Sequence, residues 1–112
     1  MPVYEIQGES PIQAMLTSTD SDQLFTTAFQ TAYTAAGGAN IDFTTIRGMW
    51  CTIENASVRV AYGQPASQSA PLGDIVNAGS NFCLQSTSII QATHFISMTA
   101  STPANLMCTI WY

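Results

Sequence analysis

A single histidine, His94, is the side chain of this sequence best suited to act as a general base near neutral pH. Together with a serine and either Asp42 or Asp74, it could form a catalytic triad. His94, however, stands between Ala92 and Ile96 in an apolar alternation, and no serine has the Gly-x-Ser-x-Gly context of a nucleophile elbow. We therefore interpret His94 as a hydrogen-bonded core or interface histidine, and we expect the protein not to be an enzyme.

The carboxylates suggest two further kinds of chemistry. A glycosidase needs two carboxylates on either side of one bond, but nothing in the sequence brings any two of Glu5, Glu9 and Glu54 together. Asp20 and Asp22 are spaced like the first two ligands of a calcium loop, yet the glycine at the sixth position and the glutamate at the twelfth are missing. We expect an acidic turn at this point and no metal site.

Cysteine usage also argues against a metal or cofactor. Cys51, Cys83 and Cys108 are widely spaced, form no Cys-x-x-Cys pair and are odd in number, so neither a zinc site nor a disulfide framework is indicated. Cys51 and Cys108 alternate with apolar residues, which predicts that both are small buried hydrophobes on strand faces. We expect no cofactor.

Formal charge is scarce. Charged residues make up 8% of the chain, where about 25% is usual, and the net charge is −5 with Arg47 and Arg59 as the two cations. This balance argues against nucleic acid as a partner, because phosphate binding depends on Lys and Arg. The two arginines are either surface pairs with Asp42 or Glu54, or contacts to an acidic partner.

No stretch approaches the roughly 18 apolar residues of a membrane-spanning helix, so we expect no membrane association. The first ten residues carry Glu5 and Glu9 and lack the basic and apolar regions of a signal peptide. We expect the chain to be made and kept in a cytoplasm.

Period-two alternation recurs along the chain and indicates strands separated by clusters of Gly, Pro, Asn, Asp and Ser. We predict strands over residues 3–7, 12–17, 24–34, 41–47, 49–54, 57–62, 81–85, 91–99 and 105–111. The last two are expected to form a hairpin. Two alternatives remain open: residues 20–33 as a short helix, with Phe25, Phe29 and Tyr33 at i, i+4 and i+8, and residues 74–80 as one helical turn.

This pattern predicts an all-β fold, a two-sheet antiparallel β-sandwich of the jelly-roll type, with residues 1–112 as one domain. The alternation places the following residues inside: Val58, Val60, Phe82, Leu84, Ile96, Leu106, Cys108 and Ile110.

The final third of the sequence, residues 75–112, has no formal charge and ends in Trp111 and Tyr112. Interface cores are depleted in charge and enriched in aromatic residues, so we interpret this segment as a contact surface. Arg47, Arg59, Trp111 and Tyr112 are the candidate interface residues. A strand-rich domain with so little charge would leave its sheet edges unprotected, which predicts a homo-dimer or homo-trimer.

From residue 48 onward, four stretches in order, "IENASVRVAYG", "NAGSNFCLQ", "IIQATHFISM" and "ANLMCTIWY", resemble small β-sandwich proteins encoded among the virion genes of tailed bacteriophages. The resemblance implies a capsid decoration or cement protein, a jelly-roll sandwich that binds the major capsid protein or another virion protein on the outer surface of the head. It implies assembly in the host cytoplasm, a final location on the virion, and no catalytic residues.

Two other roles remain open. Related sandwiches also occur in phage tails and head-completion parts. A carbohydrate-binding module would use the same fold, with Trp50, Trp111 and tyrosines as platforms on which sugars stack. Exposed, coplanar aromatic rings would favour the carbohydrate-binding module, and an open pocket holding His94 beside a carboxylate would favour an enzyme.

Overall fold

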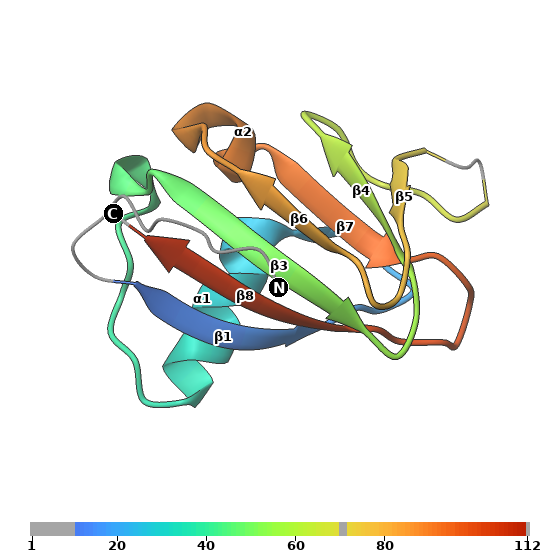
Figure 1. Ribbon diagram of the computed structural model, residues 1–112, viewed down its shortest axis with the longest axis horizontal. Helices are drawn as coiled ribbons and strands as arrows, with labels where there is room; N and C mark the ends of the chain where they lie inside the picture. The colour runs from blue at the N-terminus through green and yellow to red at the C-terminus, as the bar shows by residue number, and fades with distance from the viewer. Residues whose placement is uncertain (1–10, 70–71, 112) are drawn as a thin grey trace.

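The chain folds into two four-stranded antiparallel sheets that pack face to face (Figure 1). The computed structural model describes residues 11–69 and 72–111. The first sheet has the strand order β1-β8-β3-β6 and consists of β1 (Ile12–Thr17), β8 (Asn105–Trp111), β3 (Gly48–Glu54) and β6 (Asn81–Leu84). The second has the order β2-β7-β4-β5 and consists of β2 (Gln23–Leu24), β7 (Thr93–Ser97), β4 (Val58–Tyr62) and β5 (Asp74–Val76).

The two-sheet antiparallel sandwich predicted from the sequence is therefore confirmed. The strand orders are compatible with the predicted jelly-roll winding, which stays a prediction. The predicted strand over residues 3–7 lies outside the described residues. Of the other predicted strands, those in the regions of β1, β3, β4, β6 and β8 are present, with ends that differ by at most one residue.

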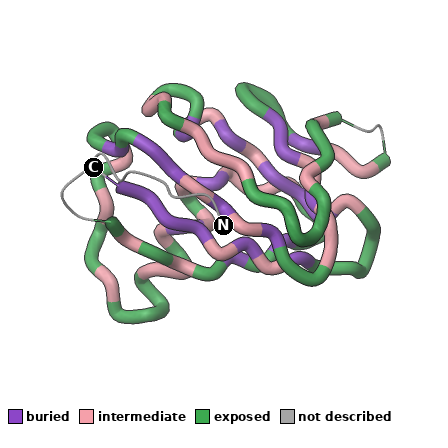
Figure 2. Tube along the Cα trace, viewed as in Figure 1, coloured by how far each residue is buried: buried purple, intermediate pink, exposed green. Residues whose placement is uncertain are grey.

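The core lies between the two sheets, and buried residues recur along β3, β4 and β8 (Figure 2). Of the eight residues predicted inside, Val58, Val60, Leu106, Cys108 and Ile110 are buried in this core, while Phe82 and Leu84 are partly buried against it. Cys51 and Cys108 are directly opposite each other on β3 and β8 and are fully buried, as predicted.

The prediction of a strand over residues 24–34 is wrong, because this segment forms helix α1 (Phe25–Ala35). Phe25 and Phe29 lie on one helical face, are 1% and 0% exposed, and have ring centroids 5.7 Å apart. This spacing fits the helical alternative, since residues four apart share a helix face. Gly37, at φ +93°, ends α1, and Gly38 N–H donates back to the Tyr33 carbonyl oxygen at 2.8 Å.

Two other short segments also differ from the predictions. Residues 41–47 form a single 3₁₀ turn, η1 (Phe43–Thr45), capped by the Asp42 side chain, instead of a strand. Helix α2 (Thr87–Gln91) was not predicted, although Ser86 caps its first turn by accepting from Ile89 N–H at 3.4 Å. The alternative of a helical turn over residues 74–80 is wrong, because β5 pairs with β4 there. Within the described residues, no helix has the length and apolar character needed to cross a bilayer.

The predicted hairpin of residues 91–99 with 105–111 is also wrong. β7 pairs with β2 and β4, whereas β8 pairs with β1 and β3, so the two strands belong to different sheets. The inward face of β7 carries Thr93, Phe95 and Ser97, so Ile96 points outward and is buried there by Ala61 and Ala66. The buried hydroxyls of β7 are satisfied: Thr93 donates to the Ile89 carbonyl oxygen at 2.7 Å, and Ser97 bonds Ser18 at 2.6 Å.

The absence of charge from residues 75–112 has an explanation within the fold. This segment contains β7 and β8, each flanked by strands on both sides within its sheet. A central strand of a sandwich contributes mainly to the core, so charged residues are excluded from it by the cost of burial. In β7 and β8 the missing charge therefore reflects packing, whereas the exposed residues of this third, such as 77–81 and 99–103, are uncharged without that cause.

Candidate functional site

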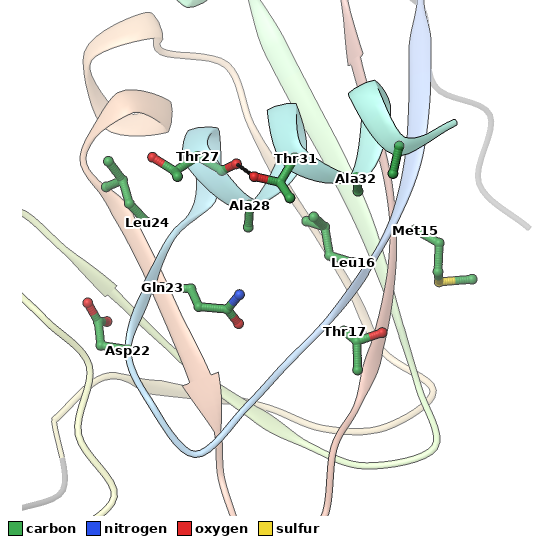
Figure 3. Close-up of a pocket in the computed structure, with 11 residues that line it drawn as sticks. Met15, Leu16, Thr17, Asp22, Gln23, Leu24, Thr27, Ala28, Thr31 and Ala32 are labelled. Atoms are coloured by element: carbon green, nitrogen blue, oxygen red, sulfur yellow. Dashed lines mark hydrogen bonds between the residues drawn. The ribbon is translucent and has the colours of Figure 1, made fainter. Parts of the chain in front are cut away.

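A hollow of about 490 Å³ opens at one side of the sandwich, between edge strand β1, strand β2 and helix α1 (Figure 3). Its volume is in the range of pockets that hold small ligands or inserted side chains. It is lined by Met15, Leu16, Thr17, Asp22, Gln23, Leu24, Thr27, Ala28, Thr31, Ala32 and Ala35.

The helix supplies small residues to this hollow. Ala28 and Ala32 are four residues apart, and Ala35 follows at the next turn, so all three lie on one side of α1. Leu24 immediately precedes the helix and adds an aliphatic side chain. Because alanine side chains are short, the helix leaves space beside β1 that larger residues would fill.

β1 forms the opposite wall. It pairs with β8 in register from Ile12 opposite Ile110 to Thr17 opposite Asn105, and it is the last strand of its sheet. Met15, 41% exposed, faces away from the core, while Leu16 is buried. The side of β1 that faces away from β8 has no ladder partner among residues 11–69 and 72–111.

The amide of Gln23 extends into the hollow (Figure 3). Its Oε1 atom is buried and accepts no hydrogen bond from any described residue. A buried acceptor without a donor costs about 1–3 kcal/mol, so such atoms are uncommon unless a ligand or water satisfies them. Thr17, Thr27 and Thr31 add hydroxyl groups around the same space.

Asp22 is at the edge of the hollow and joins three segments. Its Oδ2 atom accepts from His94 Nδ1 at 2.8 Å, and its Oδ1 atom accepts from Ala66 N–H at 2.9 Å. The side chains of His94 and Asp22 are 20% and 25% exposed. The carboxylate therefore connects the turn before β2 with β7 and with the loop that follows β4.

His94 is hydrogen-bonded, as the sequence suggested, but its partner was not identified from the sequence. The triads considered there placed Asp42 or Asp74 beside His94, whereas the structure places Asp22 there. His94 does not line the hollow, and among the described residues no hydroxyl group is bonded to its imidazole. Asp22 is 72 positions away in the chain, so no local pattern connects the two residues.

The acidic turn holds the adjoining loops by hydrogen bonds. Asp20 accepts from Ser101 N–H at 3.0 and 3.1 Å and from Gln68 Nε2 at 3.2 Å. Within the described part of the chain, no group of three or more His, Cys, Asp or Glu side chains is arranged to hold a metal ion.

The structure brings two of the candidate interface residues together and separates a third. Arg47 is exposed just before β3, and its backbone N–H donates to the Trp111 carbonyl oxygen at 2.8 Å. Arg59 lies on β4 in the other sheet and donates from Nη1 to the Gly73 carbonyl oxygen at 3.2 Å. Trp111 is only 2% exposed and packs over Gly48, so it presents little surface to a partner. Tyr112 lies outside the described residues.

The three thiols differ in their surroundings. Burial raises the pKa of the Cys51 thiol well above its ordinary value, and the neighbouring Cys108 adds to the effect. Desolvation also raises the pKa of Cys83, which is less deeply buried on β6. Raised pKa values keep the sulfur atoms protonated, a state that is a poor nucleophile and a poor metal ligand.

Another hollow, of about 280 Å³, lies near the edge of the other sheet and includes Tyr62, Gln64 and Asp74. Tyr62 is 41% exposed, and burial together with Asp74 raises the pKa of its hydroxyl. Neither tryptophan joins it: Trp111 is buried and Trp50 is half-buried on β3. The set of exposed, coplanar rings that would favour a carbohydrate-binding module is therefore not formed by these residues.

Comparisons with known proteins leave the family open. No family model and no curated protein matches the sequence. One solved structure, described as "Crystal Structure of FeII HppE", is similar over 57% of this chain, with a TM-score of 0.40 and 9% sequence identity. The matched part spans 30% of that protein's chain.

Proposed function

We propose that this protein is a structural component of a tailed-phage virion, a capsid decoration protein that binds the outer surface of an assembled head and stabilises it. One observation carries the proposal: β1 and α1, which form one side of the molecule, contain no charged residue. Residues 11–19 and 23–41 contain no Asp, Glu, Lys or Arg, although the whole chain has a net charge of −5. Protein contact surfaces are depleted in charge at their centres.

The surroundings of the hydrogen-bonded histidine favour a non-catalytic role. His94 is held by Asp22, which also holds the Ala66 amide, so the carboxylate acts as a connection between loops. A triad would need a hydroxyl nucleophile bonded to the imidazole. The described residues supply none.

Stabilisation of a capsid would follow from mass action. A protein that binds only the intact shell stabilises it by RT ln(1 + [L]/Kd), about 2.7 kcal/mol per site at a hundredfold excess over Kd. Many sites on one particle would multiply the effect. The major capsid protein or a neighbouring virion protein is the proposed partner, and the decoration protein is proposed to act as a dimer or trimer.

A glycan-binding role has one observation in its favour, the exposed Tyr62 beside Gln64 and Asp74. An aromatic ring next to an amide and a carboxylate can stack on a sugar and bond its hydroxyls. This role remains the second candidate because a single ring offers only a small platform.

The proposal is tested on particles of the phage that encodes the chain, assembled with and without this protein. Genome release on heating is followed with a DNA-binding dye. Particles that lack the protein should release DNA at a lower temperature, and adding purified protein back should restore the release temperature. Equal release temperatures in the two preparations would contradict a stabilising role.

A further inference from the structure

We propose that Cys51 and Cys108 are a site of oxidative modification, at which a low-molecular-weight disulfide such as oxidised glutathione converts the two thiols into a disulfide bond across β3 and β8. The inference rests on the strand register of this chain and does not depend on the proposed function. Both cysteines are free thiols in the structure.

The two cysteines are directly opposite each other on β3 and β8, which are neighbours in the middle of the first sheet (Figure 1). Side chains of directly opposite residues lie on the same face of a sheet, and both of these residues are 0% exposed, so both sulfur atoms lie in the core. Burial and then a hydrogen bond with the Cys108 side chain raise the pKa of the Cys51 thiol. The two thiols are therefore in contact before any oxidation.

The pair occupies a position in the ladder where the two strands come closest. Ser18 N–H donates to the Ala104 carbonyl oxygen at 2.9 Å, which continues the register of β1 with β8. The even-numbered residues of β8 therefore form their backbone hydrogen bonds with β1 and not with β3. Cys108 is one of them, so it forms a non-hydrogen-bonded pair with Cys51, and the Cα atoms of such pairs are about 4.5 Å apart.

The ladder between β3 and β6 gives the same result from the other strand. Ile53 N–H donates to the Ser80 carbonyl oxygen at 2.9 Å, so the odd-numbered residues of β3, including Cys51, bond to β6 instead of β8. Disulfides join Cα atoms about 4.4–6.8 Å apart, a range that includes the spacing of a non-hydrogen-bonded pair. A bond between Cys51 and Cys108 therefore needs no shift of strand register.

The register also excludes Cys83 as a partner. Cys83 is opposite Trp50, whereas Cys51 is opposite Phe82, and successive residues of a strand point to opposite faces. The Cys83 sulfur is therefore on the other face of the sheet from Cys51 and Cys108. Cys83 is nearer in the sequence to each of these cysteines than they are to each other, so loop closure in an unfolded chain would favour Cys83. The fold selects the more distant pair.

The reaction consists of two thiol–disulfide exchanges. The thiolate of one cysteine attacks a sulfur atom of oxidised glutathione, which forms a mixed disulfide and releases one reduced glutathione. The thiolate of the other cysteine attacks the protein sulfur of this mixed disulfide, and the second glutathione leaves. Two protein thiols are thus oxidised, one glutathione disulfide is reduced to two thiols, and the two protons pass to the released glutathiones. Because the core shields both sulfur atoms, exchange takes place while the chain folds or unfolds.

The bond would enclose most of the second sheet in one covalent loop. The chain between the two cysteines contains β4, β5, β6, α2 and β7. A disulfide that closes a long loop stabilises the native state mainly by restricting the unfolded chain. The oxidised protein should therefore melt roughly 10 °C or more above the reduced protein. In a reducing compartment, the same chain would keep both thiols.

The test uses the whole chain, which is unfolded and fully reduced in urea and then refolded in a mixture of reduced and oxidised glutathione. Remaining thiols are alkylated with iodoacetamide in urea, and the protein is digested without reductant. Trypsin cuts after Arg47 and Arg59, so the peptide with Cys51 separates from the peptide with the other two cysteines unless a disulfide joins them. We expect the two peptides to stay joined and tandem mass spectrometry to find the alkyl group on Cys83 alone.

Two variants with two cysteines each provide matched controls. Cys83→Ala keeps the proposed pair and should form the bond completely, with native circular dichroism and the higher melting temperature. Cys108→Ala keeps Cys51 and Cys83, whose side chains are on opposite faces of the sheet, so its folded form should remain reduced in the same buffer. Circular dichroism shows whether each variant is folded, and the mapping of the wild-type chain decides the question without Cys108→Ala.

An alkyl group on Cys51 or Cys108 in the refolded wild-type protein would overturn the proposal. Oxidised Cys83→Ala that melts at or below the temperature of its reduced form would overturn it as well, because the bond would then not fit the sandwich. Neither measurement needs a virus particle, so both outcomes are independent of the capsid experiment.

Discussion

Replacing Asp22 with alanine should destabilise the fold more than removal of most exposed carboxylates, because its two oxygens hold two different segments. Asp22 Oδ2 accepts from His94 Nδ1 at 2.8 Å, and Asp22 Oδ1 accepts from Ala66 N–H at 2.9 Å. Ala66 is 4% exposed, so its amide would lose its acceptor in a place that water scarcely reaches.

The size of the effect follows from these contacts. A hydrogen bond to a charged group contributes about 1.5–3 kcal/mol, and a buried donor left without a partner costs about 1–3 kcal/mol. The His94 and Asp22 side chains are one-fifth and one-quarter exposed, so water screens part of the ionic contribution. We expect Asp22→Ala to lower the free energy of unfolding by about 2–4 kcal/mol, out of a total of about 5–15 kcal/mol for a domain of this kind.

The matched variant is His94→Ala, which removes the imidazole but leaves the carboxylate bonded to Ala66. His94→Ala should lower the free energy of unfolding by about 1 kcal/mol. The double variant should lower it by less than the sum of the two single variants, because both single variants remove the same hydrogen bond between Asp22 and His94. Urea unfolding followed by circular dichroism measures all three. If Asp22→Ala cost no more than His94→Ala, the contact to Ala66 would be unimportant and the connecting role of Asp22 would be refuted.

Three further outcomes are expected. Gly48→Ala should lower the free energy of unfolding by about 1–3 kcal/mol and expose a tryptophan to solvent, because the new Cβ atom would overlap the Trp111 ring. Unchanged urea unfolding and tryptophan fluorescence would contradict this packing. A maleimide should label Cys83 first in the native protein, with the other two thiols reacting only in urea; mass spectrometry that finds three labels without denaturant would contradict their burial. Thr44→Val should raise the pKa of Asp42, which hydrogen bonds from Thr44 hold below its ordinary value, so that less native stability is lost as the pH falls through the acidic range. Carboxyl ¹³C titration that shows no rise in this pKa would contradict the expectation.

Alternation in the sequence predicts strands well where one face of the strand is buried. β1, β3, β4 and β8 alternate in this way, and their limits agree with prediction to within one residue. The same rule failed for residues 24–34, whose threonines favour strand by composition. The spacing of Phe25, Phe29 and Tyr33 decides in favour of α1, because a helix brings the three rings onto one face. The double glycine after this segment is the cap that ends the helix.

In β7, the polarity of the side chains alone does not predict which face of the strand is buried. Thr93 and Ser97 point into the core because nearby partners satisfy their hydroxyls, whereas the apolar Ile96 points outward beneath a loop. Choosing the apolar set as the inner face therefore selects the wrong register.

The candidate site was even less accessible from the sequence. The contact between His94 and Asp22, the unpaired Gln23 amide and the hollow beside β1 all depend on which segments meet in space. No local pattern in the sequence specifies which of these segments come into contact. Of the site's features, the sequence supplied one correct expectation, that His94 is hydrogen-bonded.

Binding to capsids tests the central claim most directly. Purified protein is mixed with phage heads that lack it, and the bound fraction is measured by co-sedimentation in low salt and in about 1 M salt. We expect saturable binding that survives high salt, is lost in Met15→Lys, where a cation enters the wall of the hollow, and is retained in Gln91→Lys, which is exposed on α2 and does not line the hollow. Protein that stays in the supernatant at every concentration would contradict the proposed function, and binding abolished by salt would contradict an uncharged contact.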